Sequence, residues 1–247
     1  MTDLNAFADA LIAAHRSGTR AAPDAPAPAT LAEAYQVQSR IIAGLADLGP
    51  VAGFKTACKS AAPPTMAPIR AEFTLPSGAE VTLGDEMGIE LEVGWKIIAP
   101  LPDPAEAGFD AALLRCIQPV PVIELVDTRL SGPRAEDPLA KLADFQINHG
   151  LIIGTPLANW DGRDFATVTA RMQAGDTLLL DGPAEVPGGS ALATLVALLG
   201  QIGTHCGGLQ VGQIVITGSL HPLTYVRDTC EVRGQIDGLG SVSLTLR

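Results

Sequence analysis

The sequence predicts an α+β fold that is mainly β, with a small N-terminal helical layer. Residues 2–16 repeat apolar residues at helical spacing, and a second helix is expected at 30–48. From residue 51 onward, short runs of β-branched residues alternate with Gly and Pro turns, which is typical of strands. We therefore expect an N-terminal helical segment at 1–50 and a β-rich domain at 51–247 that carries the candidate site. The two are expected to form one cooperative unit.

Composition excludes several classes of protein. The chain has 247 residues, of which 47% are hydrophobic, so it can bury a core and is not disordered. A net charge of −11 without any basic run argues against nucleic acid as a partner. The apolar run at 191–203 is too short to cross a bilayer, and the N-terminus lacks the pattern of a signal peptide. Four scattered cysteines indicate reduced thiols, so we expect a soluble cytoplasmic protein.

Local signals define the elements in chain order. Thr30, with Glu33 three residues later, predicts a capping box after the Pro/Ala linker at 21–29. Asp137 followed by Pro138, and Ser190, predict the starts of two later helices. Strands are expected at 51–56, 79–83, 87–98 and 119–130, within 146–180 and within 211–247; helices at 105–116, 136–145 and 190–205; and a Pro-rich loop at 61–70.

The strand at 87–98 carries two acidic residues on one face. Glu90 and Glu92 are two residues apart, so both side chains project to the same side, while apolar residues occupy the other. Two anions side by side repel each other and lose solvation when buried, and a bound cation would remove both costs. The alternative is an ordinary solvated strand face, and these residues alone leave it open.

A second acidic strand favours the metal interpretation. Glu124 lies in the middle of the apolar run at 119–130, where a glutamate is either an edge-strand residue or a buried functional group. If the two strands lie close together, Glu124 becomes a third oxygen ligand. Three carboxylates without a nearby His or Cys suit a hard cation, Mg²⁺ or Mn²⁺, better than Zn²⁺.

The ordered set Gly53-Phe54-Lys55, Glu90-Leu91-Glu92, the run 123–129 and Ala143-Asp144 resembles the fumarylacetoacetate hydrolase superfamily. The resemblance is stronger to its 2-oxo-4-pentenoate hydratase and 4-oxalocrotonate decarboxylase branch. It implies a mixed β-sheet roll and one divalent cation, held by a Glu-x-Glu pair and a third glutamate about thirty residues later. The spacing from Glu92 to Glu124 is 32 residues.

The resemblance also implies roles for other residues. Lys55 corresponds to an active-site lysine, although a strand lysine is otherwise an edge residue. Asp144 corresponds to an acid near the site and is a second catalytic candidate beside Lys55. Phe145 replaces the asparagine usual in the family, and whether Asn148 takes up the role of that asparagine is open. Candidates for substrate binding are Arg70, Arg129 and Ser219, with a surface arginine as the alternative for Arg70 and a turn serine for Ser219. The stretch 69–73 departs from the family pattern, which leaves the substrate open.

The chemistry implied is metal-assisted reaction of a 2-oxo or 2-hydroxy-enoate. The four histidines lack metal-ligand spacing, and only His15 lies upstream of the Glu-x-Glu strand, which disfavours the family's His–Glu hydrolysis. A lysine beside a cation is expected to have a lowered pKa and so to move protons. The sequence favours a hydratase that adds water to a 2-hydroxydienoate in aromatic catabolism. A 2-oxo-3-enedioate decarboxylase is the main alternative.

Two rival classes remain at this stage. One is a non-catalytic homologue that binds oxyacids; the other is a β-rich protein whose acidic residues are structural and bind no cation. We expect a small-molecule substrate, no nucleic-acid or membrane partner, and a homodimer or higher homo-oligomer. The last expectation rests on the exposed strand edges of the C-terminal half and on the assemblies common in the family.

Overall fold

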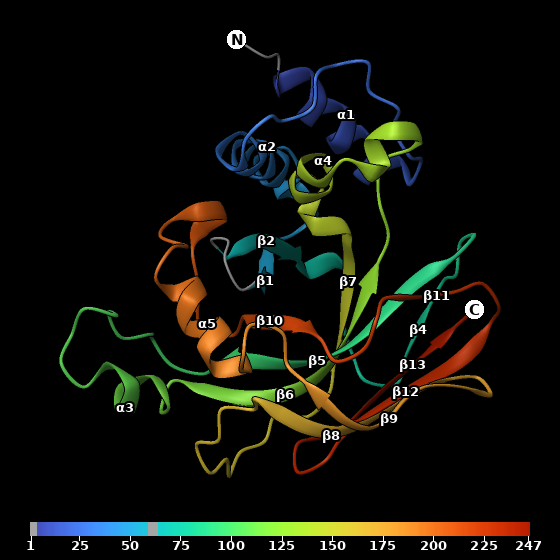
Figure 1. Ribbon diagram of the computed structural model, residues 1–247. Helices are drawn as coiled ribbons and strands as arrows, with labels where there is room; N and C mark the ends of the chain where they lie inside the picture. The colour runs from blue at the N-terminus through green and yellow to red at the C-terminus, as the bar shows by residue number, and fades with distance from the viewer. Residues whose placement is uncertain (1–3, 59–63) are drawn as a thin grey trace.

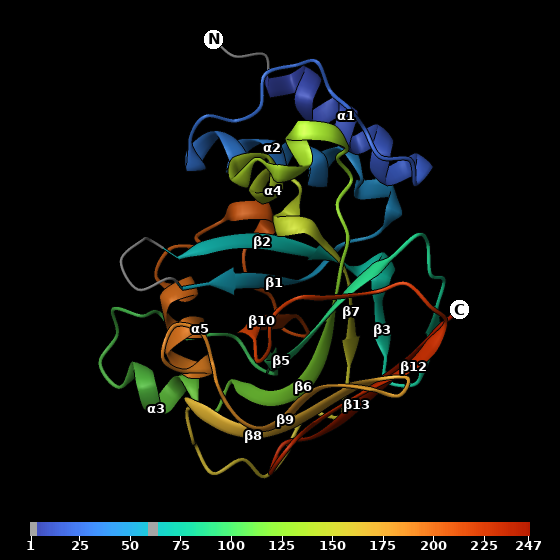
Figure 2. The same cartoon turned by 45° about the vertical axis from the view of Figure 1, so that its right-hand side comes forward.

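The computed structural model describes residues 4–58 and 64–247, and it has the predicted mainly β architecture. A helical layer lies over a large sheet, and a smaller sheet packs against the other side of that sheet (Figures 1 and 2). The helices are α1 (Leu4–Ser17), α2 (Leu31–Gly44), α3 (Phe109–Leu113), α4 (Pro138–Ala143) and α5 (Ala191–Leu199). The strands are β1 (Val51–Ala57), β2 (Thr65–Arg70), β3 (Thr74–Pro76), β4 (Ala79–Val81), β5 (Met87–Ile97), β6 (Ile117–Val126), β7 (Asn148–Ile153), β8 (Thr167–Ala174), β9 (Thr177–Glu185), β10 (Ile214–Ser219), β11 (Thr224–Val226), β12 (Cys230–Ile236) and β13 (Gly240–Leu246).

The large sheet is mixed and places β5 near its centre. Its order is β2-β1-β10-β5-β6-β7-β3, with β11 pairing with β5, and the smaller sheet has the order β4-β13-β12-β8-β9. The β1–β10, β3–β7 and β4–β13 pairs are parallel, whereas β5 is antiparallel to both β10 and β6. β10 and β7 thereby flank the two acidic strands, and β1 lies beside β10 although the two are far apart in sequence.

The main hydrophobic core lies between the two sheets. Leu91, Val93 and Trp95 on one face of β5 are fully buried there. Leu91 packs so closely on β12 that a Cβ on Gly234 would lie 2.5 Å from its Cδ1. This burial leaves the opposite face of β5, with both glutamates, toward the helical layer, as the alternation of the sequence predicts.

The helical layer is a second hydrophobic cluster. α1 and α2 pack against each other through residues such as Phe7 and Ile41, and α4 completes the cluster from the β-rich part of the chain. The predicted cap is present, because Thr30 Oγ1 accepts a hydrogen bond of 3.2 Å from the backbone N–H of Glu33. The Glu33 carboxylate in turn accepts from the backbone N–H of residue 29 at 2.7 Å. The start of the predicted helix at residues 2–3 lies outside the described residues.

The shared helical cluster bears on how the chain divides. Leu142 of α4 and Phe145 just after it are buried in the same cluster as the first 50 residues. Removing 1–50 would therefore expose apolar side chains of the β-rich part. We propose that 1–50 and 51–247 unfold together as one cooperative unit.

Three predicted elements differ from the structure. The loop at 61–70 is a strand from Thr65 onward, and an edge strand accepts Pro68 because its missing N–H need not pair; residues 61–63 lie outside the described part. The helix at 105–116 is shortened to α3, because Gly108 before it has a left-handed φ of 81°. The helix at 190–205 ends at Leu199, since Gly200 caps it and Gly203 has a φ of 48°.

The other helix and strand bounds differ from prediction by a few residues. Asp137 caps α4, as expected, and accepts bonds from the backbone N–H groups of Leu139 and Ala140. Ser190 likewise caps α5 through Ala193. Among the described residues, no helix is long and apolar enough to cross a membrane.

Candidate metal centre

Three glutamate side chains meet on the face of the large sheet that lies toward the helical layer. Glu90 and Glu92 come from β5, and Glu124 comes from β6, where it lies directly opposite Glu90 in the antiparallel register. One carboxylate oxygen from each residue lies within 4.8 Å of the other two. Strand alternation places the first two side by side, and the β5–β6 register adds the third.

Burial makes this cluster electrostatically unfavourable by itself. Glu92 and Glu124 are 2% and 0% exposed. Burial, and then the charge of Glu124, raise the pKa of Glu90 to about 7. Burial, followed by the charges of Glu124 and Glu90, also raises the pKa of Glu92 well above its usual value. Part of the negative charge is therefore removed by protonation near neutral pH unless a cation compensates for it.

Lys55 is the cation that contacts the cluster. Its Nζ donates to Glu124 Oε1 at 2.6 Å and to the backbone carbonyl of Gln146 at 3.3 Å. Burial by itself lowers the pKa of Lys55, but the charges of Glu124 and the two other glutamates outweigh it, so the pKa is raised. The lowered pKa expected from the sequence requires a bound cation that offsets these carboxylates.

The carboxylate oxygens are held in defined orientations by neighbouring donors. The Gly218 backbone N–H donates to Glu92 Oε2 at 2.6 Å, and Asn148 Nδ2 donates to Glu124 Oε1 at 2.7 Å. Glu124 Oε2 is buried and accepts no hydrogen bond from any residue that the structure describes. A buried anionic oxygen without a partner is costly, and a cation would satisfy it. These residues fit a hard divalent cation, since all three candidate ligands are oxygen atoms.

A cavity of about 580 Å³ opens above the cluster. Glu90, Glu92 and Glu124 lie in its wall together with Lys55 and Ser219. The rest of its described lining is largely apolar, and besides the end of β1 and the start of β2 it includes residues of α2, of α4 and the segment after it, and of the loop before α5: Leu31, Pro138, Leu139, Leu142, Ile147 and Pro187. The cavity thus has an ionic end and an apolar end.

Ser219 lies at the ionic end of the cavity, where the sequence places it. It pairs with Glu92 in the β10–β5 register. Its hydroxyl donates to the backbone carbonyl of His221 at 2.6 Å. This bond gives Ser219 the local role of a turn residue, while its place in the cavity wall leaves a substrate-binding role a prediction.

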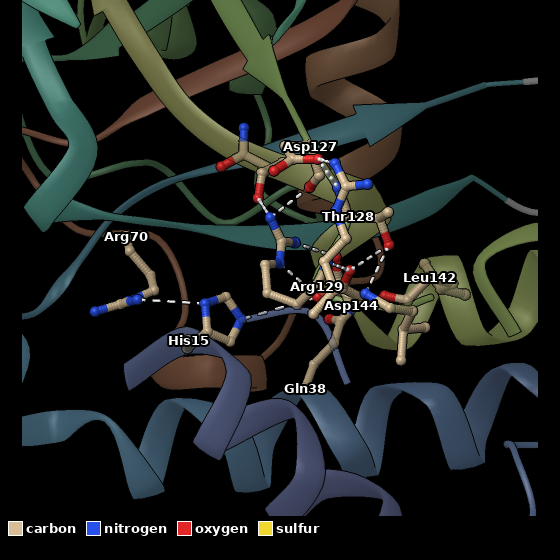
Figure 3. A network of polar contacts seen from close by, with 11 residues as sticks. His15, Gln38, Arg70, Asp127, Thr128, Arg129, Leu142 and Asp144 are labelled. Carbon is tan, nitrogen blue, oxygen red and sulfur yellow. Dashed lines mark hydrogen bonds and ion pairs between the residues drawn. The ribbon is translucent and has the colours of Figure 1, made fainter. Parts of the chain in front are cut away.

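Asp144 does not line this cavity, so the catalytic role expected for it is not supported by its position. The carboxylate is fully buried and accepts from Arg129 Nε at 2.7 Å, from the Arg129 backbone N–H at 2.8 Å and from Thr128 Oγ1 at 3.1 Å (Figure 3). Both of its oxygens are already used inside the protein. Its contacts are those of an internal anchor for Arg129.

Arg129 and Arg70 also lie away from the carboxylate cluster, in contrast to the substrate-binding role expected for them. Both line a separate cavity of about 120 Å³ beside His15. The guanidinium of Arg129 donates hydrogen bonds to Asp144 and to backbone carbonyls. Arg70 forms an ion pair with Glu72. It also approaches His15 Nδ1 at 3.4 Å (Figure 3). Neither arginine is placed to meet a substrate carboxylate at the candidate metal centre.

Sequence reasoning left one contributor to the site open and missed another. Asn148, which the sequence offered as a possible replacement for the asparagine absent at 145, is the first residue of β7 and donates its amide to Glu124. The carbonyl of Gln146 accepts from Lys55, and a backbone group carries no signal in the sequence. Residues from Phe145 to Ile147 have φ of 54°, 51° and 56°, which is unusual for non-glycine residues. No sequence motif announces this turn.

Comparison with solved structures identifies the fold. The 4-oxalocrotonate decarboxylase from Pseudomonas putida G7, solved with calcium and acetate and also with magnesium and adipate, aligns with a TM-score of 0.79 at 22% and 21% identity. Each alignment covers 99% of this chain and 97% of that protein. A yeast protein of the fumarylacetoacetate hydrolase family aligns with a TM-score of 0.56 at 11% identity, over 78% of this chain and 91% of the other.

This chain has the fumarylacetoacetate hydrolase fold. The resemblance predicted from the sequence is therefore confirmed, and so is the mixed β-sheet architecture that it implied. Relatives with this fold include enzymes that bind divalent metals, as the calcium and magnesium complexes of the decarboxylase show for that protein.

Sequence comparison gives a more limited match. The chain is 30% identical over 125 residues to 2-keto-4-pentenoate hydratase 1 of Dechloromonas aromatica (strain RCB). That alignment covers 50% of this chain and about half, 47%, of the hydratase. No family model matches the chain.

Proposed function

We propose that this protein is a divalent-metal-dependent hydratase that adds water to a 2-hydroxydienoate and forms a 4-hydroxy-2-oxo acid. The observation that carries the proposal is the convergence of Glu90, Glu92 and Glu124 beside Lys55 at one end of a cavity. Three clustered carboxylates, two of them fully buried, suit Mg²⁺ or Mn²⁺, and one oxygen of Glu124 has no hydrogen-bond partner among the described residues. Sequence similarity to a 2-keto-4-pentenoate hydratase supports the choice of reaction.

The ligand residues and Lys55 have distinct roles in this proposal. When bound, the metal supplies a Lewis acid that polarises the oxygens of a 2-oxo carboxylate. Glu90, Glu92 and Glu124 would hold it, and Gly218 and Asn148 keep two of these carboxylates oriented through hydrogen bonds. Lys55 contributes positive charge and a proton beside the reacting carbons, which is the task of a general acid–base group.

The apolar end of the cavity favours a substrate with one carboxylate. Leu31, Leu139, Leu142 and Ile147 line it, and such a surface accepts an alkene end or an alkyl substituent. Among the described residues that line this cavity, the only cation besides Lys55 is Lys141, which is bonded to exposed Glu136 at 3.1 Å. Within the described lining, a second substrate carboxylate would therefore meet little compensating charge.

Decarboxylation of a 2-oxo-3-enedioate is the second candidate. It is supported by the alignment of nearly the whole chain with 4-oxalocrotonate decarboxylase. Arg70 and Arg129, which the sequence offered as partners for a second substrate carboxylate, line the small cavity beside His15. Besides Lys55, Lys141 is the cation among the described lining residues that could bind this carboxylate.

Product identification separates these candidates. The protein would be incubated with 2-hydroxypenta-2,4-dienoate, and separately with a 2-oxo-3-enedioate, in the presence of Mg²⁺ or Mn²⁺. A hydrated acid from the dienoate, lost in Glu124→Gln, supports the proposal. Release of CO₂ from the enedioate without hydration overturns it in favour of decarboxylation. Binding of oxalate or pyruvate with metal, but no turnover of either substrate, would identify a non-catalytic oxyacid-binding homologue.

A further inference from the structure

The turn between α4 and β7 has an unusual backbone. Phe145, Gln146 and Ile147 follow one another with φ of 54°, 51° and 56°. This left-handed region favours glycine, because a Cβ crowds the backbone there, and none of the three residues is a glycine. Such a turn persists only where surrounding contacts impose it, and residues of this kind concentrate at functional sites.

The turn delivers two polar groups to the carboxylate cluster. The carbonyl of Gln146 accepts from Lys55 Nζ at 3.3 Å, and Asn148, directly after the turn, donates its amide to Glu124 Oε1 at 2.7 Å. Lys55 Nζ donates to that same oxygen of Glu124 at 2.6 Å. The turn therefore orients both the lysine and the third glutamate, while the other oxygen of Glu124 has no donor within the described part of the chain.

Arg129 and Asp144 hold both ends of this turn. Arg129 Nη2 donates to the Asp144 carbonyl at 2.7 Å, and Nη1 donates to the Asn148 carbonyl at 2.6 Å (Figure 3). The Asp144 carboxylate fixes Arg129 through Nε and the backbone N–H, at 2.7 and 2.8 Å. Side chains of both residues are at least nine-tenths buried.

We propose that Arg129 and Asp144 are positioning residues for the candidate metal centre, because they clamp residues 144–148 in the conformation that orients Glu124 and Lys55. Neither residue lines the cavity that holds the cluster, so they act through Gln146 and Asn148. The inference rests on the proposed function in one respect, namely that the carboxylate cluster is the reacting site. Any reaction catalysed there needs the same orientation.

The geometry of the clamp requires an arginine. The guanidinium presents several N–H groups in a fixed plane, and here they reach Asp144, its carbonyl and the Asn148 carbonyl at once. A lysine keeps the charge beside Asp144 but cannot bridge the two ends of the turn. Arg129→Lys thus separates the effect of charge from that of the clamp.

The test compares Arg129→Gln and Arg129→Lys with a matched control, Arg20→Gln. Arg20 lines the same small cavity as Arg129, but its ion pair with Asp127 is exposed and lies outside the clamp. The first measurement is hydrogen exchange of residues 144–150 in the metal-free protein, which is independent of substrate and metal. We expect faster exchange there in both Arg129 variants and parental exchange in Arg20→Gln. Parental exchange in the folded Arg129 variants overturns the proposal.

The second measurement is Mn²⁺ affinity by calorimetry. Loss of an outer residue that orients a metal ligand typically weakens binding by about ten-fold or more, and we expect this for Arg129→Gln and for Asn148→Ala. Both substitutions release the same contact with Glu124. The Mn²⁺ affinity of the double variant should therefore be about equal to that of whichever single variant binds Mn²⁺ more weakly. Additive losses in the double variant, or parental affinity in Arg129→Gln, would refute the clamp.

Turnover gives a third readout that a purely structural role would not produce. The folded Arg129 variants should lose kcat by about ten-fold with little change in KM, since no substrate contact is removed. If Arg129→Gln does not fold, Asp144→Asn provides the weaker perturbation, because it keeps the shape and the backbone carbonyl. A parent protein that binds Mn²⁺ but turns over neither substrate contradicts the proposed reaction alone, since hydrogen exchange and Mn²⁺ affinity still decide the clamp.

Discussion

Glu90 and Glu124 face each other directly across the antiparallel β5–β6 pair, inside a buried part of the sheet. Like charges in this arrangement destabilise a sheet, so function and stability are opposed at this pair of residues. In EDTA at pH 8, Glu90→Gln should raise the free energy of unfolding, on the order of 1 to 3 kcal/mol, because the pKa of Glu90 is raised by burial and by Glu124. Urea denaturation of the parent and the variant measures this gain, and a less stable variant would contradict it.

The same carboxylates should hold the cation. Glu→Gln substitution keeps the shape of the side chain and removes its charge, so each of Glu90→Gln, Glu92→Gln and Glu124→Gln should weaken Mn²⁺ binding markedly. Calorimetric titration of the triple variant should show no site. A matched control is Glu86→Gln, an acidic residue near the start of β5 that is paired with Arg227 outside the cluster. Undiminished binding in the triple variant would exclude the assignment.

The stability and the metal affinity should depend on pH in opposite directions. Glu90 has a pKa raised from 4.5 to about 7 in the folded protein, so its contribution to stability is complete below pH 4.5. As pH rises through about 7, the metal-free protein loses this contribution, while Mn²⁺ affinity increases because the cation replaces a proton. Urea denaturation in EDTA and titration with Mn²⁺, each at pH 5 and pH 8, measure the two trends. An unchanged pH dependence of stability in Glu90→Gln would show that another group is responsible.

Lys55 should matter more for turnover than for metal binding. It is bonded to Glu124, and its positive charge opposes a cation at the same site. Lys55→Ala should therefore keep or strengthen Mn²⁺ binding while it lowers kcat by at least about a hundred-fold, the usual contribution of a general acid–base group. The control is Lys96→Ala, on the same sheet but outside the cavity lining. If Lys55→Ala were as active as the parent, the catalytic role proposed for Lys55 would be wrong.

The smaller sheet offers a test of assembly. Leu178 on its edge strand β9 is 48% exposed. An apolar edge strand favours pairing with another chain. Light scattering at micromolar concentration should report at least a dimer. We expect Leu178→Lys to shift the mass toward the monomer of 25.5 kDa, and Val211→Lys, at an exposed loop position, to leave it unchanged. A monomeric parent protein would contradict the expected homo-oligomer.

Local signals in the sequence were sufficient for much of the fold. Alternation along 87–98 placed Glu90 and Glu92 on one face because side chains in a strand have a period of two, whatever the strand packs against. Thr30, Asp137 and Ser190 marked three helix starts, since a cap bonds to backbone groups two or three residues away. These relationships join residues that are two or three positions apart, and the sequence therefore determined them by itself.

Relationships between distant segments were decided only by the tertiary structure. Arg129 and Asp144 had the residue types of a functional site, yet they lie outside the cavity of the carboxylate cluster and bond to each other. Asn148 reaches Glu124 across the β6–β7 pair. Whether a charged side chain faces a cavity or a partner depends on strand register and on loop paths, and these are set by packing across the whole chain. No local pattern encodes that choice.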